Sequence, residues 1–441
     1  MVDNSPDWVL PALGARRAAP ASHGDQLAGV ARSYAAMGWH HTGSDVDRAT
    51  TTWLSDLLAG LGGRPRHQPY IFPRFEVDAE LYDIDGEAIE CAPLWYSRVG
   101  HIETGQLDLV ALDRDNLDAS RGYDALATPL PPGTEARVVV VGGTEQPVMA
   151  DRSAAQLGAP PTVFVAARDA HRLGLGSWLR WSAAVGPARS ANVEARFPQR
   201  RGTELIIAFS STGWYGCASE RGGPLAIGLA LANALAAEHS VRVVATSGAE
   251  IGDVGLRHWL GEAGASSRFP VICLGRSIGA AGPATQLARD GLWIVARPGQ
   301  PEGAPADRAT LDGPSTASLA DPDLRFRFQA EPPEPGQLLL DGPPVGPAMS
   351  DPSADAVRAR LRSVGAQPMP PGVGGMPSAP PRAWMGEPVD ALWATVGRPL
   401  LALDAWSSRA GTVADRADAV DPDQLVLAVD ALVDVARTLL R

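Results

Sequence analysis

Residues 205–223 read LIIAFSSTGWYGCASERGG, and this stretch decides the fold. Its first five residues are apolar, which is typical of a strand covered on both faces, and the small polar residues and glycines after them predict a loop. Pro224 then suits the first turn of a helix. A strand, a loop and a helix in this order indicate an α/β unit, whose loop usually carries the function. This loop contains neither His nor Asp, the residues expected for a metal site or for proton transfer.

Three more apolar runs accompany ELIIAF at residues 204–209: VRVVATSG at 241–248, PVICLG at 270–275 and PLLALDAW at 399–406. Helical patterns separate the first three of these four runs. We therefore predict an α/β fold with a doubly wound mixed sheet, which binds its ligand beyond the carboxyl ends of the strands.

Helices with clear end signals surround this core. They are expected at about residues 24–38, at 45–61 after a capping box of Ser44 and Asp47, and after the cap Asp421 near the C-terminus. Residues 298–388 are rich in Pro and Gly, which predicts a long irregular insertion before the last strand.

Residues 94–190 show short strand patterns and few long helical ones. A hairpin is expected just before them at Asp85-Gly86, because apolar and polar residues alternate on both sides of this pair. We predict that residues 94–190 form a β-rich domain packed beside an α/β domain made of residues 1–93 and 191–441.

The composition and charge of the chain argue against several classes of binding partner. The 441 residues carry a formal net charge of -12, and no long run of Arg is present, which argues against nucleic acid or an anionic membrane as the main partner. Three widely spaced cysteines indicate neither a disulfide framework nor a thiolate zinc site. No apolar run reaches the length of a membrane span, and we expect a cytoplasmic protein. The oligomeric state stays open.

Several segments together resemble the zinc-dependent exopeptidases with two co-catalytic metals, the group of aminopeptidases, glutamate carboxypeptidase and glutaminyl cyclases. Residues 94–190 look like the protease-associated domain that this family carries as an insert. The other segments that resemble the family are HTGSDVDRATTTWLSDLLAGLG at 41–62, SANVEARFPQRRGTELIIAF at 190–209, VRVVATSGAEIGDVGLRHWL at 241–260 and GTVADRADAVDP at 411–422.

The resemblance also implies where the two zinc ions would bind, and most of those positions have changed. Only one metal ligand keeps its identity, Glu250, and the general-base position is Ala249. The other implied positions carry Phe209 for the first histidine, Ser211 for the aspartate that orients it, Ser219 for the bridging aspartate, Gly275 or Arg276 for the next aspartate, and Gly411 for the last histidine.

A pair of zinc ions about 3.5 Å apart needs a bridging carboxylate and several N or O ligands. One glutamate cannot hold such a pair. Glu220 replaces the bridging aspartate only with a shift of one residue, and the histidines are still missing. We therefore expect a chain without metal or other cofactor.

The same loops still offer groups for chemistry and binding. The candidate catalytic residues are Glu250, Asp253, Glu220 and Ser219, and the candidate substrate-binding residues are Trp214, Tyr215, Ser211, Arg221, Arg276, Trp384 and Trp406. Glu387 follows Trp384 three positions later in the sequence. Clustered aromatic rings with a few carboxylates and an Arg suit a flat or cyclic organic ligand that bears an amine.

Two hypotheses remain. The first is a metal-independent enzyme that uses Glu250 as general acid or base for elimination, cyclisation or amide cleavage of a small amine- or peptide-like metabolite, as in specialised metabolism. It predicts that Glu250→Gln lowers turnover and leaves the melting temperature nearly unchanged. The second is an inactive pseudopeptidase that binds a ligand or a partner, in which Glu250 is structural. A working zinc aminopeptidase ranks third.

Overall fold

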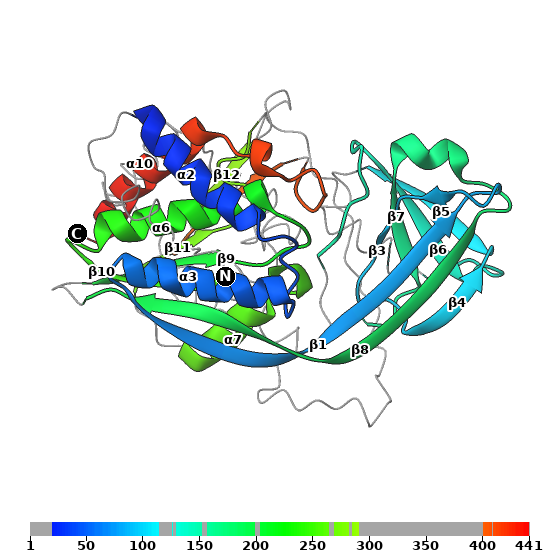
Figure 1. Ribbon diagram of the computed structural model, residues 1–441, viewed down its shortest axis with the longest axis horizontal. Coiled ribbons are helices and arrows are strands. Elements are labelled where there is room, and N and C mark those ends of the chain that lie inside the picture. Colours follow the sequence, from blue (N-terminus) through cyan, green and yellow to red (C-terminus); the bar gives the residue numbers. More distant parts are fainter. Residues whose placement is uncertain are drawn as a thin grey trace, which may run out of the picture.

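The computed structural model describes residues 20–113, 126, 129–151, 157–198, 203–263, 269–281, 285–290, 400–407 and 409–440. An α/β body and a smaller β body lie at the two ends of a long two-stranded ribbon (Figure 1). The predicted insertion at 298–388 falls outside the described residues.

The main sheet of the α/β body is mixed, as predicted. Its strand order is β12-β13-β11-β9-β10-β8-β1-β2, and β4 also pairs with β8. The neighbours β13, β11, β9 and β10 are parallel, and they contain the four apolar runs of the sequence. The strands of this sheet are β1 (Arg64–Tyr82), β2 (Ala88–Ile89), β4 (Gly100–Thr104), β8 (Trp178–Arg196), β9 (Glu204–Ser210), β10 (Ser240–Thr246), β11 (Val271–Leu274), β12 (Thr285–Asp290) and β13 (Leu400–Trp406).

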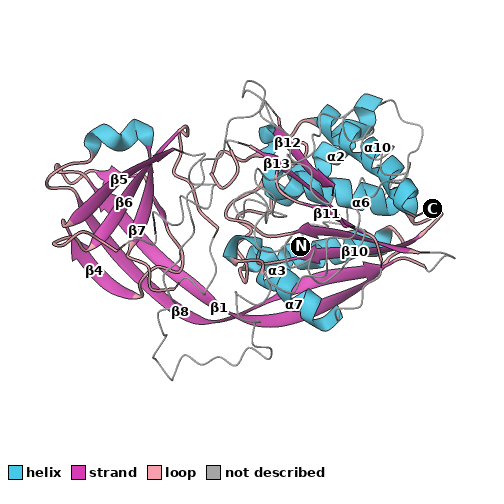
Figure 2. Ribbon diagram, turned by 180° about the vertical axis from the view of Figure 1, so that it is seen from behind, coloured by secondary structure: helices cyan, strands magenta, loops and turns pink. Residues whose placement is uncertain are grey.

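Helices cover both faces of this sheet (Figure 2). One apolar core joins Leu205, Ile207 and Phe209 of β9 to helices α2, α3, α6 and α10, whereas Ile206 and Ala208 face α7. Successive residues of β9 thus enter opposite cores, which explains why this run has no polar position. The helices are α2 (Pro20–Ala35), α3 (Asp45–Gly60), α6 (Gly223–Leu235), α7 (Val254–Ala263) and α10 (Pro422–Leu439).

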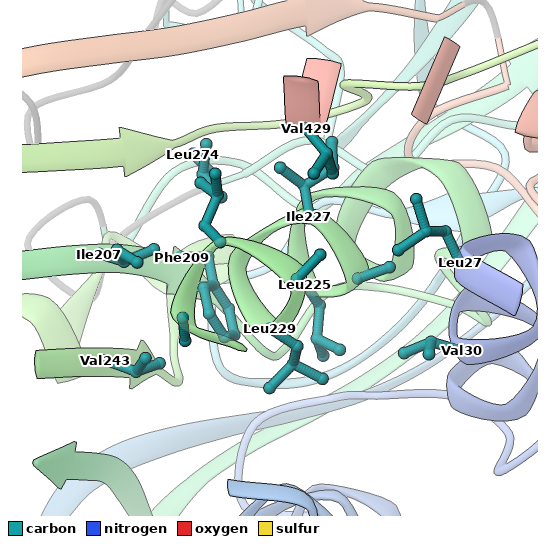
Figure 3. Packing of buried hydrophobic residues seen from close by; sticks show 14 of the residues in the cluster. Leu27, Val30, Ile207, Phe209, Leu225, Ile227, Leu229, Val243, Leu274 and Val429 are labelled. Atoms are coloured by element: carbon teal, nitrogen blue, oxygen red, sulfur yellow. The ribbon is translucent and has the colours of Figure 1, made fainter. Parts of the chain in front are cut away.

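The ring of Phe209 packs into the core against α6 (Figure 3). A Cβ added at Gly228 of α6 would lie 2.5 Å from two ring carbons of Phe209, so only glycine allows this approach. The position implied for the first zinc-binding histidine therefore belongs to the core.

The predicted caps at Ser44 and Asp421 and the hairpin turn are confirmed, whereas the helix expected at about residues 24–38 spans Pro20–Ala35. The Ser44 side chain accepts from the Asp47 amide at the start of α3, and that of Asp421 accepts from Asp423 and Gln424 at the start of α10. Gly86 adopts a left-handed conformation in the turn that pairs Tyr82 with Ala88.

The ribbon formed by β1 and β8 is the main departure from the sequence prediction. The two strands pair along 19 residues each, where only short strands were expected. Prolines at 65, 69, 73 and 187 lie within them, and prolines in a sequence argue against a regular strand. The predicted domain boundary at residues 190 and 191 falls inside β8. The division into an α/β domain and a protease-associated-like insert remains a prediction.

The β body has its own four-stranded sheet in the order β3-β7-β6-β5. Its core includes Trp95, Phe164 and Trp181 and extends to Trp214 and Ile251, which come from the loops after β9 and β10. The two bodies therefore pack through the loops expected to carry function. The remaining strands are β3 (Ala92–Pro93), β5 (Leu107–Asp113), β6 (Ala136–Gly142) and β7 (Thr162–Ala166). Among the helices described, none is long and apolar enough to cross a membrane.

Candidate functional site

The loops after β9, β10 and β11 share an unusual backbone feature. Cys217, Asp253 and Ser277, one in each loop, have positive φ angles of 50°, 56° and 58°. Side chains other than glycine rarely take this conformation, and residues held in it concentrate at functional sites. This edge of the sheet is therefore the candidate site.

Glu250 is buried in this site, and hydrogen bonds occupy both oxygens of its carboxylate. Oε1 accepts from the backbone N of Thr42 at 2.8 Å and from its hydroxyl at 2.6 Å, and Oε2 accepts from the hydroxyl of Thr212 at 2.8 Å. Thr42 lies between α2 and α3, and Thr212 follows β9. Glu250 thus joins three loops through Thr partners, and neither Arg221 nor Arg276 pairs with it in the described part of the chain. This geometry favours a structural role for Glu250.

A second buried carboxylate, that of Glu220, is also fully bonded. It lies 3.1 Å from the guanidinium of Arg221 and accepts from the Gly411 backbone N at 2.8 Å. Asp415 accepts from the backbone N of Ser219 and of Glu220 at 2.8 and 2.9 Å, and burial raises its pKa to about 6. These contacts link the loop after β9 to the one after β13.

Asp151 belongs to the β body and reaches this site, which the sequence did not reveal. Its carboxylate accepts from the indole N–H of Trp214 at 2.8 Å and lies 3.8 Å from Arg276 and 4.0 Å from Arg221. Burial raises the pKa of Asp151 to about 6, and the positive charge of Arg276 opposes this shift. About a third of the side chains of Asp151 and Arg276 is exposed, so both are open to a ligand.

Asp253 is the other carboxyl group within reach of solvent. It is half-buried, and no residue in the described part of the chain donates a hydrogen bond to its carboxylate. Burial raises the pKa of Asp253 well above its usual value, while the charge of Arg221 lowers it. Asp253 is thus a partly exposed carboxyl group at the strand-end edge of the sheet.

A cavity of about 380 Å³ lies where the ribbon and the β body meet these loops, and it is lined by residues that include Trp39, His41, Arg74, Trp95, Met149 and Tyr215. His41 was missed because it lies in the connection between α2 and α3, outside the four sheet loops. Its Nε2 bonds to the carbonyl of Trp214, and burial lowers its pKa to about 4, so the ring is neutral at pH 7. The sequence signal was the run Trp39-His40-His41 directly before the capping box.

Other predicted site residues lie in the protein interior. Ser211 donates to the carbonyl of Thr246 at 3.1 Å, and Ser219 and Trp214 are fully buried. Tyr215 lines the cavity, whereas Trp214 packs behind two lining residues through edge contacts with Trp95 and His41. Trp384, Glu387 and the side chain of Trp406 lie outside the described residues.

The residues present do not fit a pair of zinc ions. Phe209 is packed in the core, and Glu250 and Glu220 are held by Thr, Arg and backbone partners. In the part of the chain that the structure describes, no group of three or more His, Cys, Asp or Glu is placed to hold a metal. The three cysteines all lie in that part, and none forms a disulfide.

Comparison with solved structures identifies the fold. A zinc aminopeptidase from Bacillus subtilis aligns with a TM-score of 0.60 and 12% identity over 93% of this chain and 94% of that one. A peptidase M28 precursor from Shewanella amazonensis aligns with a TM-score of 0.61 and 16% identity over 96% and 97%. The chain has the fold of the zinc aminopeptidases. An aminopeptidase from Aneurinibacillus aligns with a TM-score of 0.54 and 12% identity over 95% of this chain and 94% of that one.

The alignments with these aminopeptidases extend over nearly the full length of both chains, so the β body and the ribbon lie within the similar region. No protein-family model and no curated protein sequence matches the chain. The likeness therefore lies in the fold, and the chemistry must be argued from the residues.

Proposed function

We propose that this chain is a metal-independent enzyme on a zinc-aminopeptidase-like scaffold. It acts by general acid/base chemistry on a small amine- or peptide-like metabolite. The observation that carries the proposal is Asp253, a carboxyl group with strained backbone geometry, access to solvent and no hydrogen-bond donor in the described part of the chain.

Asp253 has the properties of a proton donor. A raised pKa keeps its carboxyl group protonated in the range where ordinary aspartates are ionised, so it is able to donate a proton to a leaving group and take one back. Elimination, cyclisation and amide cleavage each need such a transfer. Arg276 and Asp151, whose charged groups lie 3.8 Å apart, supply one positive and one negative group to orient a polar substrate.

Glu250 has a different role in this proposal. Its buried carboxylate already accepts three hydrogen bonds, from the backbone N and the hydroxyl of Thr42 and from the hydroxyl of Thr212. In this proposal Glu250 is a positioning residue, which holds the loops of Thr42 and Thr212 together.

The test uses the full chain and a small-molecule extract of a bacterium, followed by mass spectrometry, with EDTA present throughout. Wild-type protein is expected to convert at least one compound. Asp253→Asn should slow that conversion by about 100-fold or more, the usual scale for a lost acid or base. Asp56→Asn, an exposed aspartate on α3, is the matched control and should change nothing. Equal conversion by Asp253→Asn removes this residue from the mechanism.

The saturated carboxylates of Glu220 and Glu250 favour a second candidate, a pseudopeptidase that binds its ligand without turning it over. In that case the extract raises the melting temperature of the wild-type protein, and no compound is consumed.

A further inference from the structure

We propose that the cavity at the junction of the ribbon and the strand-end loops binds a flat aromatic ring that carries a protonated amine. The cavity brings together Trp39 and His41 from the connection between α2 and α3, Trp95 from the segment after β3, and Tyr215 from the loop after β9. The identification of this ligand as the substrate of the enzyme rests on the proposed function. The binding of the ligand to the cavity does not depend on that function.

The rings of the cavity form a continuous aromatic wall. His41 lies between Trp39 and Trp95, with ring centroids 5.9 and 5.7 Å away, and Trp39 meets Tyr215 edge to face at 5.2 Å. The volume of about 380 Å³ lies within the range of small-molecule sites and suits a one- or two-ring ligand. Such a wall offers both stacking surface and the negative ring faces that attract a cation.

Trp39 offers the largest open ring surface among the four aromatic residues of the wall, because 57% of its surface is exposed. Its neighbours in the wall are largely covered, and Trp95 is only 7% exposed. A large indole left open beside a cavity is stabilised when a second flat ring covers it.

Two charged side chains line the cavity, and the negative one, Glu76, is more exposed than the positive one, Arg74. Arg74 already donates to the carbonyl of Gly43 at 3.0 Å and lies 3.6 Å from Glu76. The Glu76 side chain is 70% exposed, which leaves its carboxylate accessible to an ammonium group at the mouth. His41 is neutral at pH 7 and adds no positive charge that would repel such a group.

The experiment compares three probes that share an indole ring: tryptamine, which is a cation, tryptophol, which is neutral, and indole-3-propionate, which is an anion. Binding to the full chain is measured by calorimetry at pH 7. Tryptamine is expected to bind most tightly. Trp39→Ala should weaken tryptamine binding about 3- to 30-fold, the range of a lost cation–π and stacking contact.

Two further variants make the test specific. Glu76→Gln should weaken tryptamine binding about 2- to 5-fold and leave tryptophol binding unchanged, as expected for a partly exposed ion pair. Trp178→Ala, which removes an indole stacked on Tyr82 outside the cavity, is the matched control and should have no effect.

Three results overturn the proposal: no tryptamine binding, tighter binding of tryptophol or indole-3-propionate, or full affinity in Trp39→Ala. Asp253→Asn separates this inference from the proposed enzyme. If that variant binds tryptamine normally and also retains the wild-type conversion rate, the binding site stands and the catalytic role of Asp253 falls.

Discussion

Replacing Thr212 with Val should destabilise the protein by about 3–5 kcal/mol, although the two side chains have nearly the same shape. The Thr212 hydroxyl donates to Glu250 at 2.8 Å and accepts from the buried backbone N of Gly248 at 2.7 Å. A hydrogen bond to a charged group contributes about 1.5–3 kcal/mol, and a buried donor left without a partner costs about 1–3 kcal/mol. Both losses occur in this variant, and no cavity forms to confuse the result.

Urea unfolding followed by far-UV circular dichroism measures this loss. Thr52→Val is the matched control, because Thr52 is exposed on α3 and bonds only to its own helix, and it should change the free energy of unfolding by less than about 0.5 kcal/mol. In Glu250→Gln the cost of Thr212→Val should shrink by about 1–2 kcal/mol, since the charge that needs the hydroxyl is gone. A Thr212→Val variant as stable as the wild type would refute the structural role of Glu250 and return it to the list of candidate acids.

Three other changes test the packing, the buried histidine and the metal. Gly228→Ala should cost about 1–3 kcal/mol through the clash with Phe209, whereas Gly261→Ala on α7, where nothing lies within 4 Å, should stabilise by up to about 1 kcal/mol; thermal unfolding of the pair checks this. Burial lowers the pKa of His40 to about 4, so below pH 6.5 only the unfolded chain gains its proton and the wild type loses stability. The difference in free energy of unfolding between wild type and His40→Gln should therefore narrow by about 2 kcal/mol from pH 7 to pH 5. A difference that stays constant over this pH range contradicts the prediction. Elemental analysis should find no stoichiometric zinc, and EDTA should leave the melting temperature unchanged. One or two zinc ions per chain would contradict the conclusion that the residues present do not fit a pair of zinc ions.

Much of the fold was predictable because local patterns and tertiary environment agree. The four apolar runs are neighbouring parallel strands, and Ser44 and Asp421 cap the helices that they precede. The ribbon was not predictable, since its stability comes from pairing between residues 96 to 132 positions apart, from Tyr82 with Trp178 to Arg64 with Arg196. Pro73 lies directly opposite Pro187 there, a pairing that no local propensity favours.

The candidate site, like the fold, was predictable from the sequence only in part. The sequence located the edge of the sheet and named Asp253, Arg276 and Tyr215, which the structure leaves accessible. The sequence did not reveal which candidates are buried or what they contact: Trp214 is fully buried, and Glu250 accepts three hydrogen bonds. Asp151 and His41 were missed because they lie 63 and 173 positions from Trp214, to which each is bonded.

The residues at the positions implied for the zinc ligands contribute to contacts that hold the strand-end loops together. A buried metal pair would join the strand-end loops through its ligands, and a chain without those ligands needs another link. Glu250 links the loops at Thr42 and Thr212, and Glu220 links the loop after β9 to Gly411, the position implied for the last zinc-binding histidine. Polar residues at the strand ends are thus of two kinds: the buried carboxylates of Glu250 and Glu220, which hold the loops together, and the partly exposed groups Asp253, Asp151 and Arg276, which the proposed function uses to meet a ligand.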